Sequence, residues 1–319
     1  MAKYLITGFS GFVGKHFLEY LARERKQASI LGIDLHPPGF KANDFPGLTW
    51  KYEKIDLIEK RKVENSLRNF QPDYILHLAS YSSVAFSWKN PTLSFQNNTN
   101  IFLNLLETVR KFNLRSRILA VGSSDEYGNV TPNNLPLKED SPLNPVSPYA
   151  VARVSQELLA KIYVEGFGLD IVRTRSFNHI GPGQREIFVI SSFAKQMVEL
   201  KKSRQSSSRI ITGDTSIIRD FVDVRDVVRA YDLLFQKGRT GEVYNICRGK
   251  GHSLQEIIKT MAGIMKIKVV AKVDPKLIRP SDNRIIIGSN KKIRKEAGWQ
   301  PEITLQQSLK DIIRYWQKK

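Results

Sequence analysis

The sequence predicts an α/β fold built on a doubly wound, mostly parallel sheet, with a smaller α/β region toward the C-terminus. Three observations predict it. Short apolar runs alternate with amphipathic segments through the first half of the chain, a glycine-rich turn follows the first apolar run, and the second apolar run ends in an acid. Strands separated by helical segments are typical of a parallel sheet with helices on both faces. The strands of such a sheet are largely apolar, as these runs are.

The first half of the chain contains the core of this sheet. In the first predicted helix, Val13, Phe17 and Leu21 recur at helical spacing. The predicted strands are residues 3–6, 30–34, 74–78, 118–121 and 170–175, and the predicted helices are residues 12–23, 61–69, 91–112 and 147–164.

The pattern changes after about residue 177, where Gly181-Pro182-Gly183 interrupts the chain. An apolar helix near 190–200 is followed by a polar loop and short strands. Asp223 is a predicted N-cap of a helix running to about residue 235. We therefore predict a first domain over residues 1–177, to which about 210–246 also contribute, and a second over 178–319. Further predicted elements are a strand at 241–246 and helices near 253–265 and 305–316.

Composition excludes several classes of protein. The 319 residues are 41% hydrophobic and 25% charged, as in ordinary globular proteins. No apolar run approaches the roughly 20 residues of a membrane span, and the N-terminus lacks the features of a signal peptide. The single cysteine, Cys247, excludes an internal disulfide, and the five histidines show no metal-ligand spacing. We expect a cytoplasmic protein without metal or membrane partners.

The net charge of +19 comes from basic residues spread along the whole chain. The densest run, residues 291–295, is typical of a solvated helix face. No nucleic-acid-binding motif interleaves with the basic residues, so we do not predict a nucleic-acid partner.

Three glycines, Gly8, Gly11 and Gly14, stand three residues apart between the first strand and the first helix. Glycines let the backbone approach a pyrophosphate, and a helix N-terminus supplies free N–H groups. Incidental glycines could share this spacing. Asp34, 20 residues after Gly14, favours dinucleotide binding because an acid there meets the ribose hydroxyls. It would repel a 2′-phosphate, so NAD(H) is favoured over NADP(H), although His36 weakens that preference. The predicted loop contacts are Gly8, Ser10, Gly11, Phe12, Val13 and Gly14.

Ser123, Tyr149 and Arg153 form a candidate catalytic group. Ser123 follows a predicted strand, and the other two stand one helical turn apart. A tyrosine can exchange a proton with a carbonyl or alcohol oxygen, but its ordinary pKa of about 10 hinders ionisation. A neighbouring cation stabilises the phenolate, and a serine hydroxyl can hold the substrate oxygen. Taken alone, a tyrosine–arginine pair at this spacing is usually a surface contact.

The motifs at residues 7–14, 56–57, 77–79 and 147–153 resemble, in the same order, those of the extended short-chain dehydrogenases/reductases. The resemblance covers nearly the whole chain and implies a Rossmann-type fold for the first domain. It also implies an oxidoreductase with Ser123, Tyr149 and Arg153 as catalytic residues. The family motif has lysine where this chain has Arg153, which keeps the charge but has a planar fork. The implied cofactor contacts beyond the glycine loop are Asp56, Leu57, Leu78, Ala79, Asn98, Tyr149, Arg153 and Phe177.

Within the family, residues 122–128, 175–184 and 219–226, with shorter segments at 277–281 and 287–291, are similar to enzymes acting on GDP-mannose derivatives. The resemblance implies reduction of the C4 ketone of GDP-4-dehydro-6-deoxy-D-mannose to a GDP-6-deoxyhexose of the GDP-D-rhamnose type. Tyrosine would deliver the proton, and guanidinium groups would match the diphosphate oxygens. The implied substrate-binding residues are Ser83, Ser123, Asn178, Val189, Arg219, Arg279 and Asp282.

Other activities stay open at this point. A 4,6-dehydratase needs a base at C5, and resembling dehydratases carry Thr-Asp-Glu or Thr-Ser-Glu where this chain has Ser123-Ser124-Asp125. Asp125 could serve as that base, with Ser124 beside it, although its side chain is one methylene shorter than glutamate. A 4-epimerase needs only the shared core, and a non-catalytic dinucleotide sensor would bind the cofactor without turnover. The resemblance further implies a homodimer formed through the helices near 91–112 and 147–164.

Overall fold

The computed structural model describes residues 1–24, 27–203, 208–278 and 283–319. Its main body is a seven-stranded sheet in the order β10-β6-β5-β4-β1-β2-β3, in which every neighbouring pair is parallel. This is the predicted α/β, doubly wound fold. The strands are β1 (Ala2–Thr7), β2 (Ala28–Asp34), β3 (Leu48–Lys54), β4 (Tyr74–His77), β5 (Arg117–Ser123), β6 (Ile171–Ser176) and β10 (Val243–Ile246).

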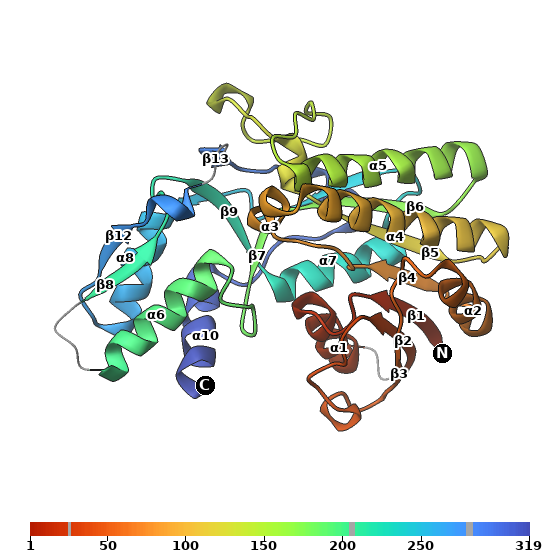
Figure 1. Ribbon diagram of the computed structural model, residues 1–319, viewed down its shortest axis with the longest axis horizontal. Helices are drawn as coiled ribbons and strands as arrows, with labels where there is room; N and C mark the ends of the chain where they lie inside the picture. Colours follow the sequence, from red (N-terminus) through yellow and green to blue (C-terminus); the bar gives the residue numbers. More distant parts are fainter. Residues whose placement is uncertain (25–26, 204–207, 279–282) are drawn as a thin grey trace.

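Helices cover both faces of this sheet (Figure 1). One apolar core lies under α1, α7 and α9, and the other lies under α2, α4 and α5. Successive residues of β1 serve the two cores in turn: Tyr4 and Ile6 enter the first and Leu5 the second. The helices are α1 (Phe12–Glu24), α2 (Lys60–Phe70), α3 (Val84–Lys89), α4 (Pro91–Lys111), α5 (Pro148–Phe167), α7 (Val224–Lys237) and α9 (Lys291–Ala297).

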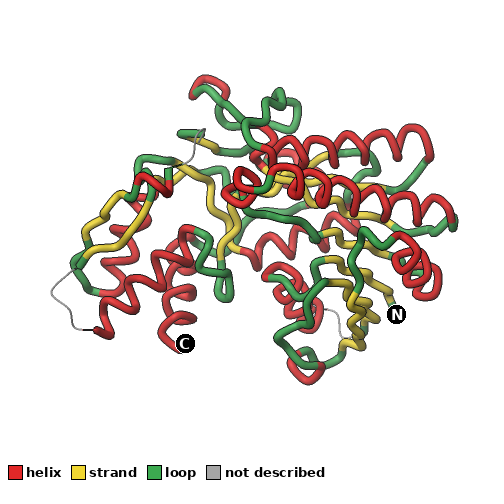
Figure 2. The backbone as a smooth tube through the Cα atoms, in the orientation of Figure 1, coloured by secondary structure: helices red, strands yellow, loops and turns green. Residues whose placement is uncertain are grey.

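A smaller region of helices and short strands lies beside the main sheet (Figure 2). Its core packs around Phe193, Met197, Ile257 and Trp316. The helices are α6 (Val189–Ser203), α8 (Leu254–Met265) and α10 (Leu305–Lys318). The strands are β7 (Asn178–Ile180), β8 (Arg209–Thr212), β9 (Ile218–Asp223), β11 (Gly251–Ser253), β12 (Val270–Val273) and β13 (Ile285–Ile286). Short 3-10 turns are η1 (Ala42–Asp44), η2 (Ser124–Tyr127), η3 (Pro132–Asn134) and η4 (Pro275–Leu277).

The chain leaves the main sheet after β6 and returns to it with α7 and β10. The predicted N-cap at Asp223 is present, because its carboxylate accepts from the backbone N–H of Arg225 at the start of α7. β10 then adds to the sheet beside β6, in the predicted segment. Among the described residues, no helix combines the length and the apolarity that crossing a bilayer would take.

Candidate active site

The site begins where the strand order of the main sheet reverses. β1 lies between β4 and β2, so the segments leaving β1 and β4 turn to opposite faces of the sheet. Ligands of doubly wound sheets bind in the crevice at this point, beyond the carboxyl ends of the strands. The glycine loop follows β1, and Leu78 and Ala79 follow β4. The two segments touch, since the N–H of Ala79 donates to the hydroxyl of Thr7 over 3.2 Å.

The glycine loop needs the residues it has. Gly8 has a φ of +68°, and a Cβ there would lie 2.9 Å from the backbone nitrogen of Ala79. A Cβ on Gly14 would lie 2.4 Å from the carbonyl oxygen of Phe9. The loop therefore leads directly into α1, whose first N–H groups have no partner within the helix. These features fit a pyrophosphate held by backbone donors at the helix N-terminus.

Asp34 ends β2 and faces the same loop. Its Oδ2 accepts from the N–H of Ser10 over 3.0 Å, and its Oδ1 accepts from the N–H of His36 over 3.2 Å. The hydroxyl of Ser10 donates to the carbonyl oxygen of His36 over 2.7 Å, which closes the contact. The carboxylate is thus fixed beside the loop, where a nucleotide ribose is expected.

Tyr149 and Arg153 lie on the first turns of α5, and both are buried. Ser147 caps the helix by accepting from the N–H of Ala150 over 3.1 Å. The Nε of Arg153 donates to the Tyr149 hydroxyl over 3.2 Å, and the guanidinium carbon lies 5.2 Å from the centre of the tyrosine ring. The predicted pair is therefore a buried contact, in which the guanidinium of Arg153 is hydrogen-bonded to the hydroxyl of Tyr149.

Ser123 is the last residue of β5, and α5 packs against both β5 and η2. Its hydroxyl accepts from the N–H of Asp125 over 3.2 Å, and its own N–H donates to Glu126 Oε1 over 2.6 Å. Burial, and then the charge of Glu157, raise the pKa of Glu126 well above its ordinary value. Glu126 therefore holds the backbone of Ser123 in place. Asp125, the other acid of η2, is half-buried and lies closer to the surface.

Glu157 follows Tyr149 and Arg153 on α5 and is bound by Arg175 from β6. The Nε and Nη2 of Arg175 donate to the two carboxylate oxygens over 2.9 and 2.7 Å. Burial opposes ionisation of Glu157, but the hydrogen bonds and charge of Arg175 outweigh it and lower the pKa of Glu157. This buried ion pair joins α5 to the sheet behind Tyr149.

The remaining predicted cofactor contacts come from the segments that follow β3, β4 and β6 and from α4. Asp56 accepts from the N–H of Ile58 over 3.0 Å, and Leu57 is buried. Asn98 accepts from the N–H of Tyr81 over 2.8 Å, so it holds the segment that follows β4. Phe177 is buried between β6 and β7. Which of these contact a cofactor stays a prediction.

The predicted substrate residues come from both regions of the molecule. Asn178 begins β7 and is exposed, and Arg219 lies on β9, the strand that pairs with β7. Val189 begins α6, and Ser83 caps α3 by accepting from the N–H of Phe86. Arg279 and Asp282 lie outside the described residues.

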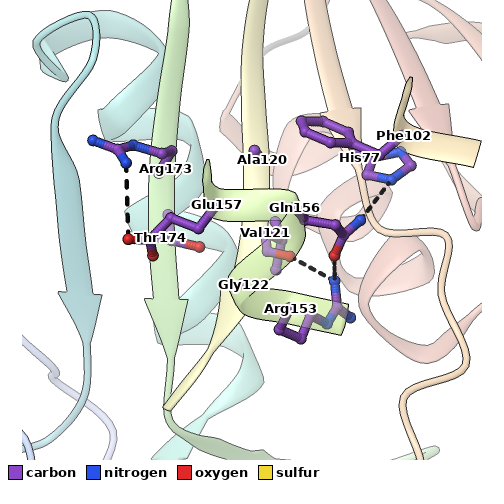
Figure 3. Close-up of a pocket in the computed structure, with 10 residues that line it drawn as sticks. All are labelled: His77, Phe102, Ala120, Val121, Gly122, Arg153, Gln156, Glu157, Arg173 and Thr174. Carbon is purple, nitrogen blue, oxygen red and sulfur yellow. Dashed lines mark hydrogen bonds and ion pairs between the residues drawn. The ribbon is translucent and has the colours of Figure 1, made fainter. Parts of the chain in front are cut away.

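Two polar side chains beside Arg153 were not predicted. Gln156 accepts from Arg153 Nη1 over 2.8 Å (Figure 3). The hydroxyl of Ser80 accepts from Nη2 over 2.5 Å. A signal for Gln156 exists in the sequence, because Tyr149, Arg153 and Gln156 recur at helical spacing on one face. Ser80 carries no comparable signal. Within the described ranges, no three His, Cys, Asp or Glu side chains are grouped to hold a metal ion.

Comparison with known proteins gives one consistent relationship. A profile of the GDP-mannose 4,6 dehydratase family matches residues 5–312. GDP-6-deoxy-D-mannose reductase of Pseudomonas aeruginosa is 33% identical over 98% of this chain and 97% of its own. UDP-glucuronate 4-epimerase of Thermodesulfobacterium geofontis is 31% identical over 100% of this chain and 97% of its own.

Solved structures agree with the sequence comparison. RMD from Pseudomonas aeruginosa, complexed with NADPH, has a TM-score of 0.85 at 33% identity and covers 100% of this chain and 99% of its own. UDP-glucose 4-epimerase of Thermus thermophilus, in complex with NAD, has a TM-score of 0.86 at 26% identity and covers 98% of each chain. The fold thus accommodates both nicotinamide dinucleotides among its relatives.

Proposed function

Because this chain belongs to the extended short-chain dehydrogenases/reductases that act on nucleotide sugars, we propose that it is an NAD(P)H-dependent reductase. Its substrate would be GDP-4-dehydro-6-deoxy-D-mannose, and its product a GDP-6-deoxyhexose of the GDP-D-rhamnose type. The observation that carries the proposal is the buried 3.2 Å contact between Arg153 Nε and the Tyr149 hydroxyl. The 33% identity to a GDP-6-deoxy-D-mannose reductase supports this substrate.

The residues divide the chemistry between them. When bound, the reduced nicotinamide supplies a hydride to the C4 carbon of the sugar. Tyr149 donates its proton to the C4 oxygen, and Arg153 stabilises the phenolate that this leaves. Ser123 hydrogen-bonds the same oxygen and orients the ketone. Gly8, Gly11 and Gly14 hold the pyrophosphate of the dinucleotide on the start of α1.

A reductase assay tests the proposal. The keto-sugar is made from GDP-mannose with a separate dehydratase, which is then removed, and this protein is added with NADH or NADPH. We expect loss of the reduced-nicotinamide absorbance in proportion to a new 6-deoxyhexose. The reductase proposal would be overturned if the folded protein binds the cofactor but oxidises neither NADH nor NADPH.

A dehydratase is the second candidate, and the position of Asp125 favours testing it. This half-buried acid lies two residues after Ser123, in η2, at the position where the resembling dehydratases carry glutamate. A dehydratase converts GDP-mannose itself without consuming added nicotinamide. We expect no keto-sugar from GDP-mannose alone, and its appearance would favour the dehydratase over the reductase.

We propose that the protein prefers NADH to NADPH, because the fixed carboxylate of Asp34 would repel the 2′-phosphate of NADPH. In Asp34→Asn, we expect the ratio of kcat/KM for NADH to that for NADPH to fall about tenfold or more. Asparagine keeps an oxygen that can accept from the N–H of Ser10. Damage to the loop alone would lower kcat/KM for NADH and for NADPH together and leave their ratio unchanged. The matched control is Asp56→Asn, which should leave the ratio unchanged. An unchanged ratio in Asp34→Asn would contradict this assignment.

We further propose a homodimer formed through α4 and α5, which pack side by side. Leu158 and Ile162, one turn apart on α5, are 53% and 59% exposed, and Phe95 on α4 is 40% exposed. Burial of such a face against a second copy would remove apolar surface from water. By light scattering, the protein should have the mass of two chains and Ile162→Glu that of one, while Val270→Glu, at an equally exposed apolar site, stays dimeric. A monomeric parent protein would refute the dimer.

A further inference from the structure

Arg153 is held on all three of its guanidinium nitrogens. Nη1 donates to the carbonyl oxygen of Val121 over 2.9 Å and to Gln156 Oε1 over 2.8 Å, and Nη2 donates to the Ser80 hydroxyl over 2.5 Å. Nε donates to the hydroxyl of Tyr149 over 3.2 Å. A guanidinium is planar, with donors in fixed directions, so anchoring Nη1 and Nη2 fixes where Nε points.

Gln156 is itself fixed from its other end (Figure 3). Its Nε2 lies 3.5 Å from His77 Nε2, and His77 Nδ1 lies 2.9 Å from the hydroxyl oxygen of Thr7. Because Gln156 Oε1 accepts from Arg153, its Nε2 must donate, so His77 Nε2 is an acceptor and Nδ1 carries the hydrogen. Burial, and then the charge of Arg153, lower the pKa of His77 to about 3. The imidazole is therefore neutral near pH 7 and can accept.

This row of side chains connects two parts of the site. Thr7 is the last residue of β1, directly before the glycine loop, and His77 is the last residue of β4. Both are buried, as is Gln156. The guanidinium that contacts Tyr149 is thus connected, through Gln156 and His77, to the ends of β4 and β1, the strands that precede the two segments of the site.

We propose that Gln156, braced by His77, is a positioning residue that directs the Nε of Arg153 at the hydroxyl of Tyr149. The role rests on the proposed function, because it acts through Tyr149 as the proton donor. Without an acceptor at position 156, Nη1 keeps only its bond to the carbonyl oxygen of Val121, so the direction of the guanidinium plane is held less tightly. The phenolate left by proton transfer then loses an oriented cation, and the barrier to reduction rises.

Other ionisable groups on β6, β7, α5 and α7 lie near this cation. Burial is the main cause that lowers the pKa of His179 on β7, to about 4, and raises the pKa of Tyr231 on α7. The charge of Arg153 lowers the pKa of both groups. Arg173 from β6 and Glu157 from α5 line the same small cavity as Gln156 and Arg153. Glu157 is bound by Arg175. A change at position 156 is therefore expected to reach Tyr149 chiefly through Arg153.

The test is a double-mutant cycle between positions 156 and 153. Gln156→Met keeps the length of the side chain and removes the acceptor. We expect it to lower kcat for reduction about tenfold, with little change in KM for NADH. In an Arg153→Lys background, whose compact ammonium has no Nη1 to be oriented, we expect the same change to alter kcat by less than about twofold. The control is Gln236→Met, the same substitution on α7, where the side-chain amide donates to Asp232.

The pH dependence gives a second readout. Reduction requires a protonated tyrosine, so activity falls at alkaline pH where the phenolate forms. Loss of an oriented cation disfavours the phenolate, so the alkaline limb of the pH–rate profile should move to higher pH in Gln156→Met. Equal losses of kcat in both backgrounds, or an unmoved alkaline limb, would overturn the positioning role.

An NMR titration of the tyrosine ring carbons separates this inference from the proposed function. The Tyr149 signal is assigned by its loss in Tyr149→Phe, and no turnover is needed. We expect its titration midpoint to rise in Gln156→Met and to stay unchanged in Gln236→Met. If the parent protein reduces no keto-sugar, the proposed function fails while a raised midpoint still supports the orientation of Arg153. An unchanged titration midpoint of Tyr149 in Gln156→Met overturns the positioning role of Gln156, whether or not the protein reduces the keto-sugar.

Discussion

Tyr149→Phe is expected to lower kcat for reduction of the keto-sugar by about a hundredfold to ten-thousandfold, the usual contribution of a positioned general acid. Phenylalanine keeps the ring that packs in this buried position and removes the one atom that can deliver the proton. Arg153 retains its bonds to Val121, Gln156 and Ser80, so we expect NADH to bind with nearly its original affinity.

Tyr163→Phe is the matched control for this change. Tyr163 lies on the same helix, is similarly buried, and donates to Glu107 Oε1 over 2.6 Å. Both variants lose a hydrogen bond to an ionised group, so both should lose about 1.5–3 kcal/mol of stability. Steady-state kinetics and thermal unfolding, measured together, separate the two roles. Retention of more than a tenth of the original kcat by Tyr149→Phe would exclude it as the proton donor.

Gly14→Ala is expected to impair folding and cofactor binding together. The added Cβ would lie 2.4 Å from the carbonyl oxygen of Phe9, and that atom belongs to the backbone of the loop and cannot turn aside. The start of α1 must then move away from the loop. We expect the free energy of unfolding to fall by about 1–3 kcal/mol, as in other overpacked sites. NADH affinity should fall at least about tenfold, since the helix N–H groups leave their positions.

Gly166→Ala is the control for that substitution. Gly166 also lies in a helix, α5, but a Cβ there would meet no atom within 4 Å. Alanine is the better helix former, so we expect stability to rise by about 0.5–1 kcal/mol with unchanged NADH affinity. Urea denaturation and NADH fluorescence titration measure both quantities. Equal behaviour of the two variants would show that the loop does not require glycine at position 14.

The sequence predicted the parts of the fold whose signal is local. The strands at residues 3–6 and 74–78, and the helix capped by Asp223, were found because apolar periodicity and cap residues lie within a few positions of each other. β3 was missed. It is an edge strand whose side chains, such as Thr49 and Lys51, alternate toward solvent, so it lacks the apolar run of a central strand.

The same distinction holds for the site. Gly8, Gly14 and Asp34 follow a spacing that a dinucleotide imposes, and the structure places them around one loop. Gln156 is a partner of Arg153 with a local signal, its helical spacing, but the partners outside α5 could not be predicted in this way. Ser80 contacts Arg153 from the segment that follows β4, and His77, the last residue of β4, contacts Gln156. Both are far away in the sequence, and only the packing of α5 on the sheet brings them together.

Transfer of isotope from the cofactor tests the reductase most directly. The protein is supplied with GDP-4-dehydro-6-deoxy-D-mannose and NADH carrying deuterium at the transferable position of the nicotinamide. We expect one deuterium on C4 of the 6-deoxyhexose for each NADH oxidised, because a reductase delivers the hydride of its added cofactor to the ketone carbon. A sugar product without deuterium at C4, or NADH left unoxidised beside unchanged keto-sugar, would contradict the proposed reaction.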